Sequence, residues 1–144
     1  MTEREEYSIP EGFYYTKDHE WVRRKTGESD VVLVGITDYA AKMLHDIVYV
    51  TLPQEGQILS QEEVLGQVES VKTVADVYMP VSGSILKTNQ ELTLKPELIS
   101  ESPYESGWMV EVKASNLDNE LKSLLSRNQY SEYVNQLKAS EEEA

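Results

Sequence analysis

A lysine stands where two runs of β-forming residues meet, in the stretch QVESVKTVADVYM at residues 67–79. If one face of each run packs inward, the chain reverses around Lys72, and its amine projects beyond the sheet with Glu69 and Asp76 on the flanking strands. No Gly, Asn, Asp or Pro stands at the reversal to make a tight turn. This arrangement offers a primary amine held clear of the core, although an ordinary solvated turn lysine would show the same pattern.

Other chemistry is poorly represented in the sequence. The two histidines, His19 and His45, fall in different expected elements and have no partner at the i, i+4 spacing of a helical metal site. The chain has no cysteine, which excludes disulfides, thiol nucleophiles and cysteine-ligated metals. No P-loop, G-x-G-x-x-G or G-x-S-x-G motif occurs. The sequence therefore contains no complete active site.

The composition indicates one soluble domain. The chain has 144 residues, enough for a single core, and its apolar runs, such as residues 31–34, are too short to span a bilayer. The 26 Asp and Glu outnumber the 13 Lys and Arg, and the resulting net charge of -13 disfavours nucleic acid as a partner. The N-terminus, MTEREEYS, lacks the pattern of a secretory signal. We therefore expect a cytoplasmic protein that does not enter a membrane.

Short β-rich segments separated by turn signals predict a small barrel or sandwich. Residues 13–24 and 31–36 should form a hairpin, and Thr37 can cap a short helix that follows it. Further strands are expected at 47–52 and 108–113. Beyond the last strand, leucines and then tyrosines recur at helical spacing, which predicts C-terminal helices.

A short repeat lies in the middle of the chain. Residues 53–59 and 80–86 share the pattern P-x-x-G-x-I-L, and Val-Tyr precedes each copy by a few residues. Two copies are too few for a solenoid, but they fit a sheet pair related by internal two-fold pseudosymmetry. In that arrangement Gly56 and Gly83 would supply the positive φ of tight turns.

The stretch ESVKTVADVYMPVSG, residues 69–83, resembles the lipoyl-attachment hairpin of the glycine cleavage system H protein family. The resemblance covers about residues 13–134. Further matching segments occur in the family's order: HEW at 19–21, VGITDYA at 34–40, DIVYVTLP at 46–53, PELI at 96–99, SPY at 102–104 and GW at 107–108.

The resemblance implies a mainly β barrel-sandwich hybrid, as in lipoyl domains, with a short internal helix and C-terminal helices. In that family the lysine that matches Lys72 is amide-linked to (R)-lipoate, and Glu69, Ser70 and Val71 belong to the attachment motif. The protein would then be a carrier and not an enzyme, because the cofactor does the chemistry. Acylation would also remove the charge of Lys72 and bring in the sulfur that the chain lacks.

Partners and boundaries follow from the same resemblance. The arm would take the aminomethyl group of glycine from glycine decarboxylase (P protein) to aminomethyltransferase (T protein), and dihydrolipoamide dehydrogenase (L protein) would reoxidise it. A lipoyl-attaching enzyme is a further expected partner, and we expect a monomer. Residues 1–12 should be a flexible N-terminus, residues 13–138 the carrier domain and residues 139–144 a disordered acidic tail.

A loaded arm carries a cationic, water-labile amine, and a groove beside a carboxylate would protect it. Glu20 and Asp76 are the candidates for that carboxylate, although Glu20 could instead be an exposed strand residue.

Three positions depart from the family pattern: His45 and Ser106 where Gly is usual, and Ser100 where Asn is usual. They leave open a second cargo, a sulfur species of a heterodisulfide-reductase-like sulfur-oxidation system. A biotinyl carrier is disfavoured because Val71 and Thr73, not methionines, flank the lysine.

Overall fold

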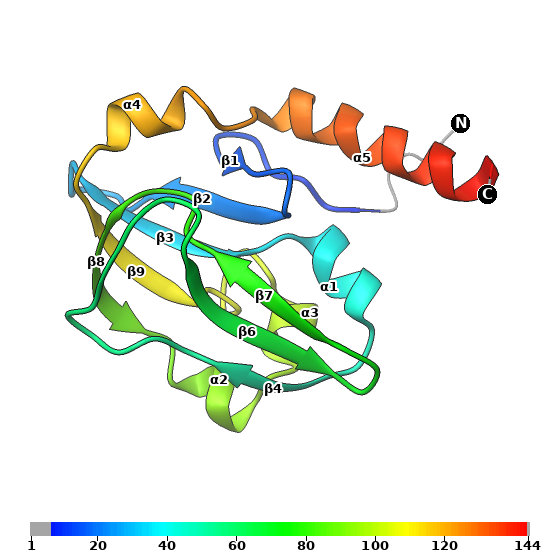
Figure 1. Ribbon diagram of the computed structural model, residues 1–144, viewed down its shortest axis with the longest axis horizontal. Helices are drawn as coiled ribbons and strands as arrows, with labels where there is room; N and C mark the ends of the chain where they lie inside the picture. The colour runs from blue at the N-terminus through cyan, green and yellow to red at the C-terminus, as the bar shows by residue number, and fades with distance from the viewer. Residues whose placement is uncertain (1–6, 144) are drawn as a thin grey trace.

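The computed structural model of the chain describes residues 7–143. Its strands form two antiparallel sheets, six strands in the order β1-β2-β3-β9-β8-β5 and three in the order β4-β6-β7 (Figure 1). The strands are β1 (Tyr14–Tyr15), β2 (Glu20–Arg24), β3 (Val31–Ile36), β4 (Ile47–Thr51), β5 (Ile58–Leu59), β6 (Val64–Ser70), β7 (Val74–Tyr78), β8 (Gly83–Thr88) and β9 (Val110–Ala114). The helices are α1 (Asp38–Leu44), α2 (Glu91–Leu94), α3 (Leu98–Glu101), α4 (Leu117–Leu121) and α5 (Arg127–Glu143).

The predicted fold class is confirmed: the chain is mainly β, with a short internal helix after β3 and two helices at its C-terminal end. Two further short helices, α2 and α3, which the sequence did not predict, lie between β8 and β9. Within the described residues neither sheet closes into a barrel, and the two sheets enclose one apolar core. No described helix has the length and apolar character needed to cross a membrane.

Two buried clusters follow from the alternation of side chains along the strands. Val22 belongs to a cluster that holds side chains of both sheets, such as Val68 and Val112. Its neighbour Trp21 faces the opposite side and belongs to an aromatic cluster that includes Tyr130 of α5. The C-terminal helix is therefore fixed to the outer face of the six-stranded sheet (Figure 1).

The hairpin of β6 and β7 turns its apolar residues inward, as its alternation predicted. Val68 and Val77 are buried, while Val64, which strand alternation would place on the same face as Val68, is 46% exposed. The pairing slips between Val64 and Gly66, and this bulge turns Leu65 into the core. A Cβ at Gly66 would overlap a backbone carbonyl of β4, so glycine is needed where the two strands approach.

The two copies of the repeat pair with each other. β5 and β8 are antiparallel, and Leu59 lies opposite Gly83. Gly56 has a φ of 88°, as its turn required. Gly83 does not adopt a positive φ, so the expected turn role is wrong for this copy. A Cβ there would overlap the Lys113 carbonyl oxygen of β9, and close strand approach is the reason for this glycine.

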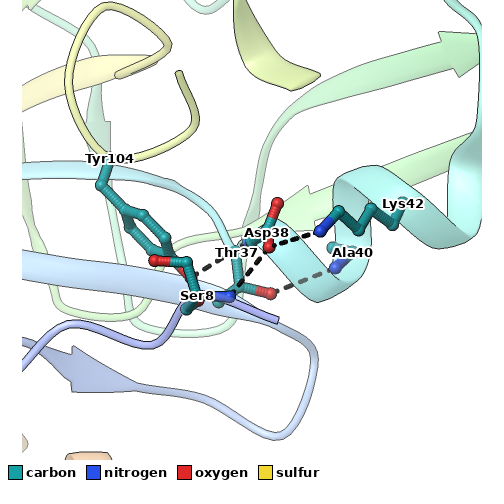
Figure 2. A network of polar contacts seen from close by, with 6 residues as sticks. All are labelled: Ser8, Thr37, Asp38, Ala40, Lys42 and Tyr104. Carbon is teal, nitrogen blue, oxygen red and sulfur yellow. Dashed lines mark hydrogen bonds and ion pairs between the residues drawn. The ribbon is translucent and has the colours of Figure 1, made fainter. Parts of the chain in front are cut away.

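The first described residues join the domain through α1. Thr37 caps α1 by accepting the Ala40 N–H at 3.2 Å. Asp38 accepts the Ser8 N–H at 2.9 Å and pairs with Lys42 at 3.1 Å, while the Tyr104 hydroxyl donates to the Ser8 carbonyl at 2.6 Å (Figure 2). Residues 1–6 of the expected flexible segment lie outside the described residues.

The helix α5 continues through residues 139–143, where the sequence predicted a disordered acidic tail. Glu and Ala are good helix formers, and they extend a helix that is already anchored at its start by Tyr130 and Val134. Residue 144 lies outside the described residues, and the domain boundaries stay predictions.

Candidate functional site

The tip of the β6–β7 hairpin carries Lys72, and a serine side chain closes the turn. The Ser70 N–H donates to the Thr73 carbonyl at 2.8 Å. The Ser70 Oγ accepts the N–H groups of Lys72 and Thr73 at 3.3 and 3.1 Å. The Ser70 hydroxyl donates to the Thr73 carbonyl at 3.2 Å. A serine at the first position of a turn can replace the missing turn residues in this way. Ser70 belongs to the attachment motif, but the motif by itself did not indicate this role in the turn.

The tip is open to solvent on the side of the lysine. Val71 is 72% exposed, and its N–H donates to the Asp46 carbonyl at 3.1 Å, which ties the tip to the segment after α1. Lys72 is exposed, and within residues 7–141 its ammonium makes no hydrogen bond or ion pair. The amine is thus sterically free to react with another molecule.

The two acidic residues expected around Lys72 share the outward face of the hairpin. Glu69 is exposed and lies opposite Val74, and Asp76 is exposed and lies opposite Gln67. The Gln67 side-chain amide donates to the Asp76 carboxylate at 2.8 Å. Both carboxylates therefore face solvent and not the core.

A hollow of about 290 Å³ lies beside β7, three residues from the lysine. That separation is roughly 10 Å along an extended strand. Figure 1 shows α1, which contributes to the hollow, at the same end of the molecule as the hairpin tip. The walls are mostly apolar or aromatic: Asp18, His19, Tyr39, Ala40, Met43, Leu44 and Ala75. A long hydrocarbon chain on Lys72 could lie here with its apolar surface removed from water.

A second hollow, of about 250 Å³, shares Asp18 with the first and is lined in part by Glu20. Glu20 is 1% exposed, so the alternative of an exposed strand residue is wrong. Its carboxylate accepts the Thr16 hydroxyl at 2.6 Å and the Tyr78 N–H at 3.0 Å. Burial raises the pKa of Glu20 to about 7, against the opposing effect of these two hydrogen bonds.

The two candidate carboxylates for the arm groove, Glu20 and Asp76, lie in different environments. Glu20 lies inside the molecule against the backbone of Tyr78, whereas Asp76 lies on the outward face and lines neither hollow. A cation in the second hollow would favour the charged form of Glu20. The geometry thus gives Glu20, and not Asp76, the environment of a buried carboxylate.

Two of the three departures from the family pattern meet in space. His45, which ends α1 with a φ of 65°, and Ser100 line a third hollow together with Asp46. The Asp46 carbonyl accepts the Val71 N–H, so these departures lie beside the segment that holds the hairpin tip. The described residues contain no group of three His, Cys, Asp or Glu side chains placed to hold a metal.

Comparisons with known proteins agree over nearly the whole chain. Residues 13–137 match the family model described as Glycine cleavage H-protein. A probable glycine cleavage system H protein of Pyrococcus furiosus is 50% identical over 137 residues, covering 95% of this chain and 100% of the relative. The glycine cleavage system H protein of Staphylococcus epidermidis is 47% identical, covering 88% and 98%. The crystal structure of a glycine cleavage system H protein from Mycobacterium marinum matches with a TM-score of 0.74 and 38% identity, covering 90% of this chain and 99% of that one.

Proposed function

Because the chain belongs to the glycine cleavage H-protein family, we propose that it is a lipoyl carrier with lipoate amide-linked to Lys72. The observation that carries the proposal is the exposed amine of Lys72, which has no partner among the described side chains, at the tip of an intact hairpin. The residues fit the group: a free amine can be acylated, and an apolar hollow lies within reach of a lengthened lysine. Lipoate, when attached, supplies a disulfide that can accept the aminomethyl group of glycine.

The proposed partners are those of the glycine cleavage system. The carrier would receive the aminomethyl group from glycine decarboxylase and deliver it to aminomethyltransferase, and dihydrolipoamide dehydrogenase would reoxidise the arm. A lipoyl-attaching enzyme would modify Lys72 first. The exposed Glu69, Val71 and Asp76 around the lysine are the side chains that these proteins would meet.

The protein itself would supply attachment, positioning and shelter from water. Met43, Leu44 and Ala75 would take up the hydrocarbon part of the arm. Glu20 would attract the cationic amine, because a positive charge next to a buried carboxylate offsets the cost of its ionisation. We therefore propose Glu20 as the carboxylate of the arm groove and assign Asp76 to the docking face.

Intact mass tests the attachment. Protein made in a lipoate-competent host should gain one lipoyl group, and Lys72→Arg should abolish the gain. The matched control, Lys113→Arg, changes another exposed lysine on β9 and should leave the gain intact. The absence of added mass in the wild type, or added mass that survives in Lys72→Arg, would refute the proposal.

The cargo needs a separate assay. Lipoylated protein incubated with glycine decarboxylase, glycine and labelled bicarbonate should support exchange of label into glycine. A lipoylated protein that supports no exchange would refute the glycine assignment while leaving the attachment in place. A sulfur cargo would then remain as the alternative, which is favoured only by the departures at His45 and Ser100 next to Asp46.

A further inference from the structure

A buried hydrogen-bond chain joins α1, α5 and the turn before β2. The Thr37 Oγ1 lies 2.8 Å from the Tyr130 hydroxyl oxygen, which lies 2.8 Å from His19 Nδ1. Thr37 and Tyr130 are each 0% exposed, so their hydroxyl protons must be donated within the protein. The partners, 93 and 111 residues apart, come together only in the fold.

The direction of donation along this series of hydrogen bonds follows from which atoms can donate and which can accept. Thr37 Oγ1 accepts the Ala40 N–H, and the Tyr130 oxygen is its one possible acceptor among the described residues. Thr37 therefore donates to Tyr130, and Tyr130 donates its own proton to His19 Nδ1. Nδ1 is then an acceptor, and a neutral His19 carries its proton on Nε2.

The imidazole is held in place and kept uncharged. Its ring packs against Tyr39 and Tyr133, with centroids 4.8 and 5.9 Å away. The backbone has a φ of 74°, and the His19 carbonyl accepts the Thr37 N–H at 2.9 Å. Burial lowers the pKa of His19 to about 4, although Asp18 acts in the opposite direction.

The other ring nitrogen is available to a ligand. Within residues 7–141, Nε2 of His19 has no hydrogen-bond partner. In the same residues, the one buried side-chain nitrogen or oxygen without a partner is Nε of Arg23. Nε2 is therefore reached by solvent, and His19 lines the hollow beside Ala75. The hydrogen-bond chain thus leaves one N–H donor on a neutral ring at the wall of this hollow.

We propose that His19 is a positioning residue for the arm, donating its Nε2–H to a sulfur of the dithiolane or dithiol when the arm lies in the hollow. This inference rests on the proposed attachment at Lys72. A neutral ring suits the task because an imidazolium would repel the ammonium of an aminomethyl cargo. Tyr130 acts through His19, which gives the C-terminal helix a part in the site.

Long-range proton–nitrogen NMR of the histidine side chains tests the arrangement without any partner enzyme. His45→Gln would leave His19 as the one remaining histidine of the chain. At pH 7 we expect an unprotonated Nδ1 and a protonated Nε2. Tyr130→Phe should shift the Nδ1 resonance, while Tyr133→Phe, whose hydroxyl donates to the Lys17 carbonyl at 3.2 Å, should not. A protonated Nδ1 would overturn the assignment.

The contact with the arm is tested on protein whose lipoylation has been verified by mass. Lipoylation should shift the Nε2 and Nε2–H resonances of His19, and Lys72→Arg should show the unmodified positions. Unmoved Nε2 resonances in lipoylated protein would overturn the positioning role. A missing lipoyl mass would refute the attachment instead, and the tautomer result would still be read from the unmodified protein.

A chemical measurement distinguishes hydrogen-bond donation by His19 from simple packing of its ring. Spontaneous loss of the aminomethyl group from the loaded carrier in buffer should be about tenfold faster in His19→Leu, because the loss of one hydrogen bond changes a rate by about that factor. His19→Gln should restore most of the protection, because its amide presents a donor near the position of Nε2. Equal rates in the wild type, His19→Leu and His19→Gln would contradict the proposal.

Discussion

Glu20→Gln should change the pH dependence of folding stability in a defined direction. The substitution keeps the shape of the side chain and can keep both contacts, because the amide oxygen can accept the Tyr78 N–H and the amide nitrogen can donate to Thr16 Oγ1. The substitution therefore removes only the ionisable carboxyl group. A difference between the two proteins therefore reports the buried carboxyl group.

The magnitude follows from the pKa of Glu20, which burial raises from 4.5 to about 7. The folded state then binds this proton more tightly than the unfolded state does. The stability that Glu20 contributes is fully present below pH 4.5 and is lost as the pH rises to about 7. The loss amounts to about 3 kcal/mol by the linkage between pKa and free energy.

His19 acts in the opposite direction in part of this range. Its pKa is lowered from 6.5 to about 4, so its contribution is present above pH 6.5 and is lost as the pH falls to about 4. In the wild type the two contributions oppose each other between pH 4.5 and 6.5. In Glu20→Gln the unfolding free energy should rise with pH over this range, because only the contribution of His19 remains.

Urea unfolding at several pH values between 4.5 and 8 measures this effect. The unfolding free energy of Glu20→Gln minus that of the wild type should increase by about 3 kcal/mol across the range. Glu132→Gln, at an exposed position of α5, is the matched control and should give a flat difference. A flat difference for Glu20→Gln would show that the buried carboxyl titrates as in the unfolded chain, and the reasoning would be refuted.

Two further predictions concern the hairpin that carries the lysine. Gly66→Ala should lower the unfolding free energy by about 3 kcal/mol, because its Cβ would overlap the Thr51 carbonyl, whereas Gln67→Ala on the outward face should cost under about 1 kcal/mol. Equal melting temperatures for Gly66→Ala and the wild type would contradict this packing. Ser70→Ala should cost about 1–2 kcal/mol and speed amide exchange at Thr73, because the buried hydroxyl closes the turn. Unchanged exchange at Thr73 would mean that the hydroxyl does not hold the tip.

Local patterns were sufficient to predict most elements of this protein. The cap at Thr37, the β2–β3 hairpin, the helices at the end of the chain and the reversal at Lys72 were all readable from the sequence. Each depends on neighbours in the chain: a side chain that accepts a nearby N–H, or an alternation of apolar residues with the period of a strand. The motif around Lys72 likewise indicated the family that the comparisons show.

Packing between segments that are distant in the chain decided the features that the sequence did not reveal. The sequence did not show that Gly83 permits close contact with β9, because that contact joins strands far apart in the chain. It also could not show that Tyr130 of α5 bonds to His19, or that Glu20 is buried while Asp76 is not. The pKa of Glu20 depends on how much water surrounds its carboxyl group, and only the tertiary structure determines that amount of water.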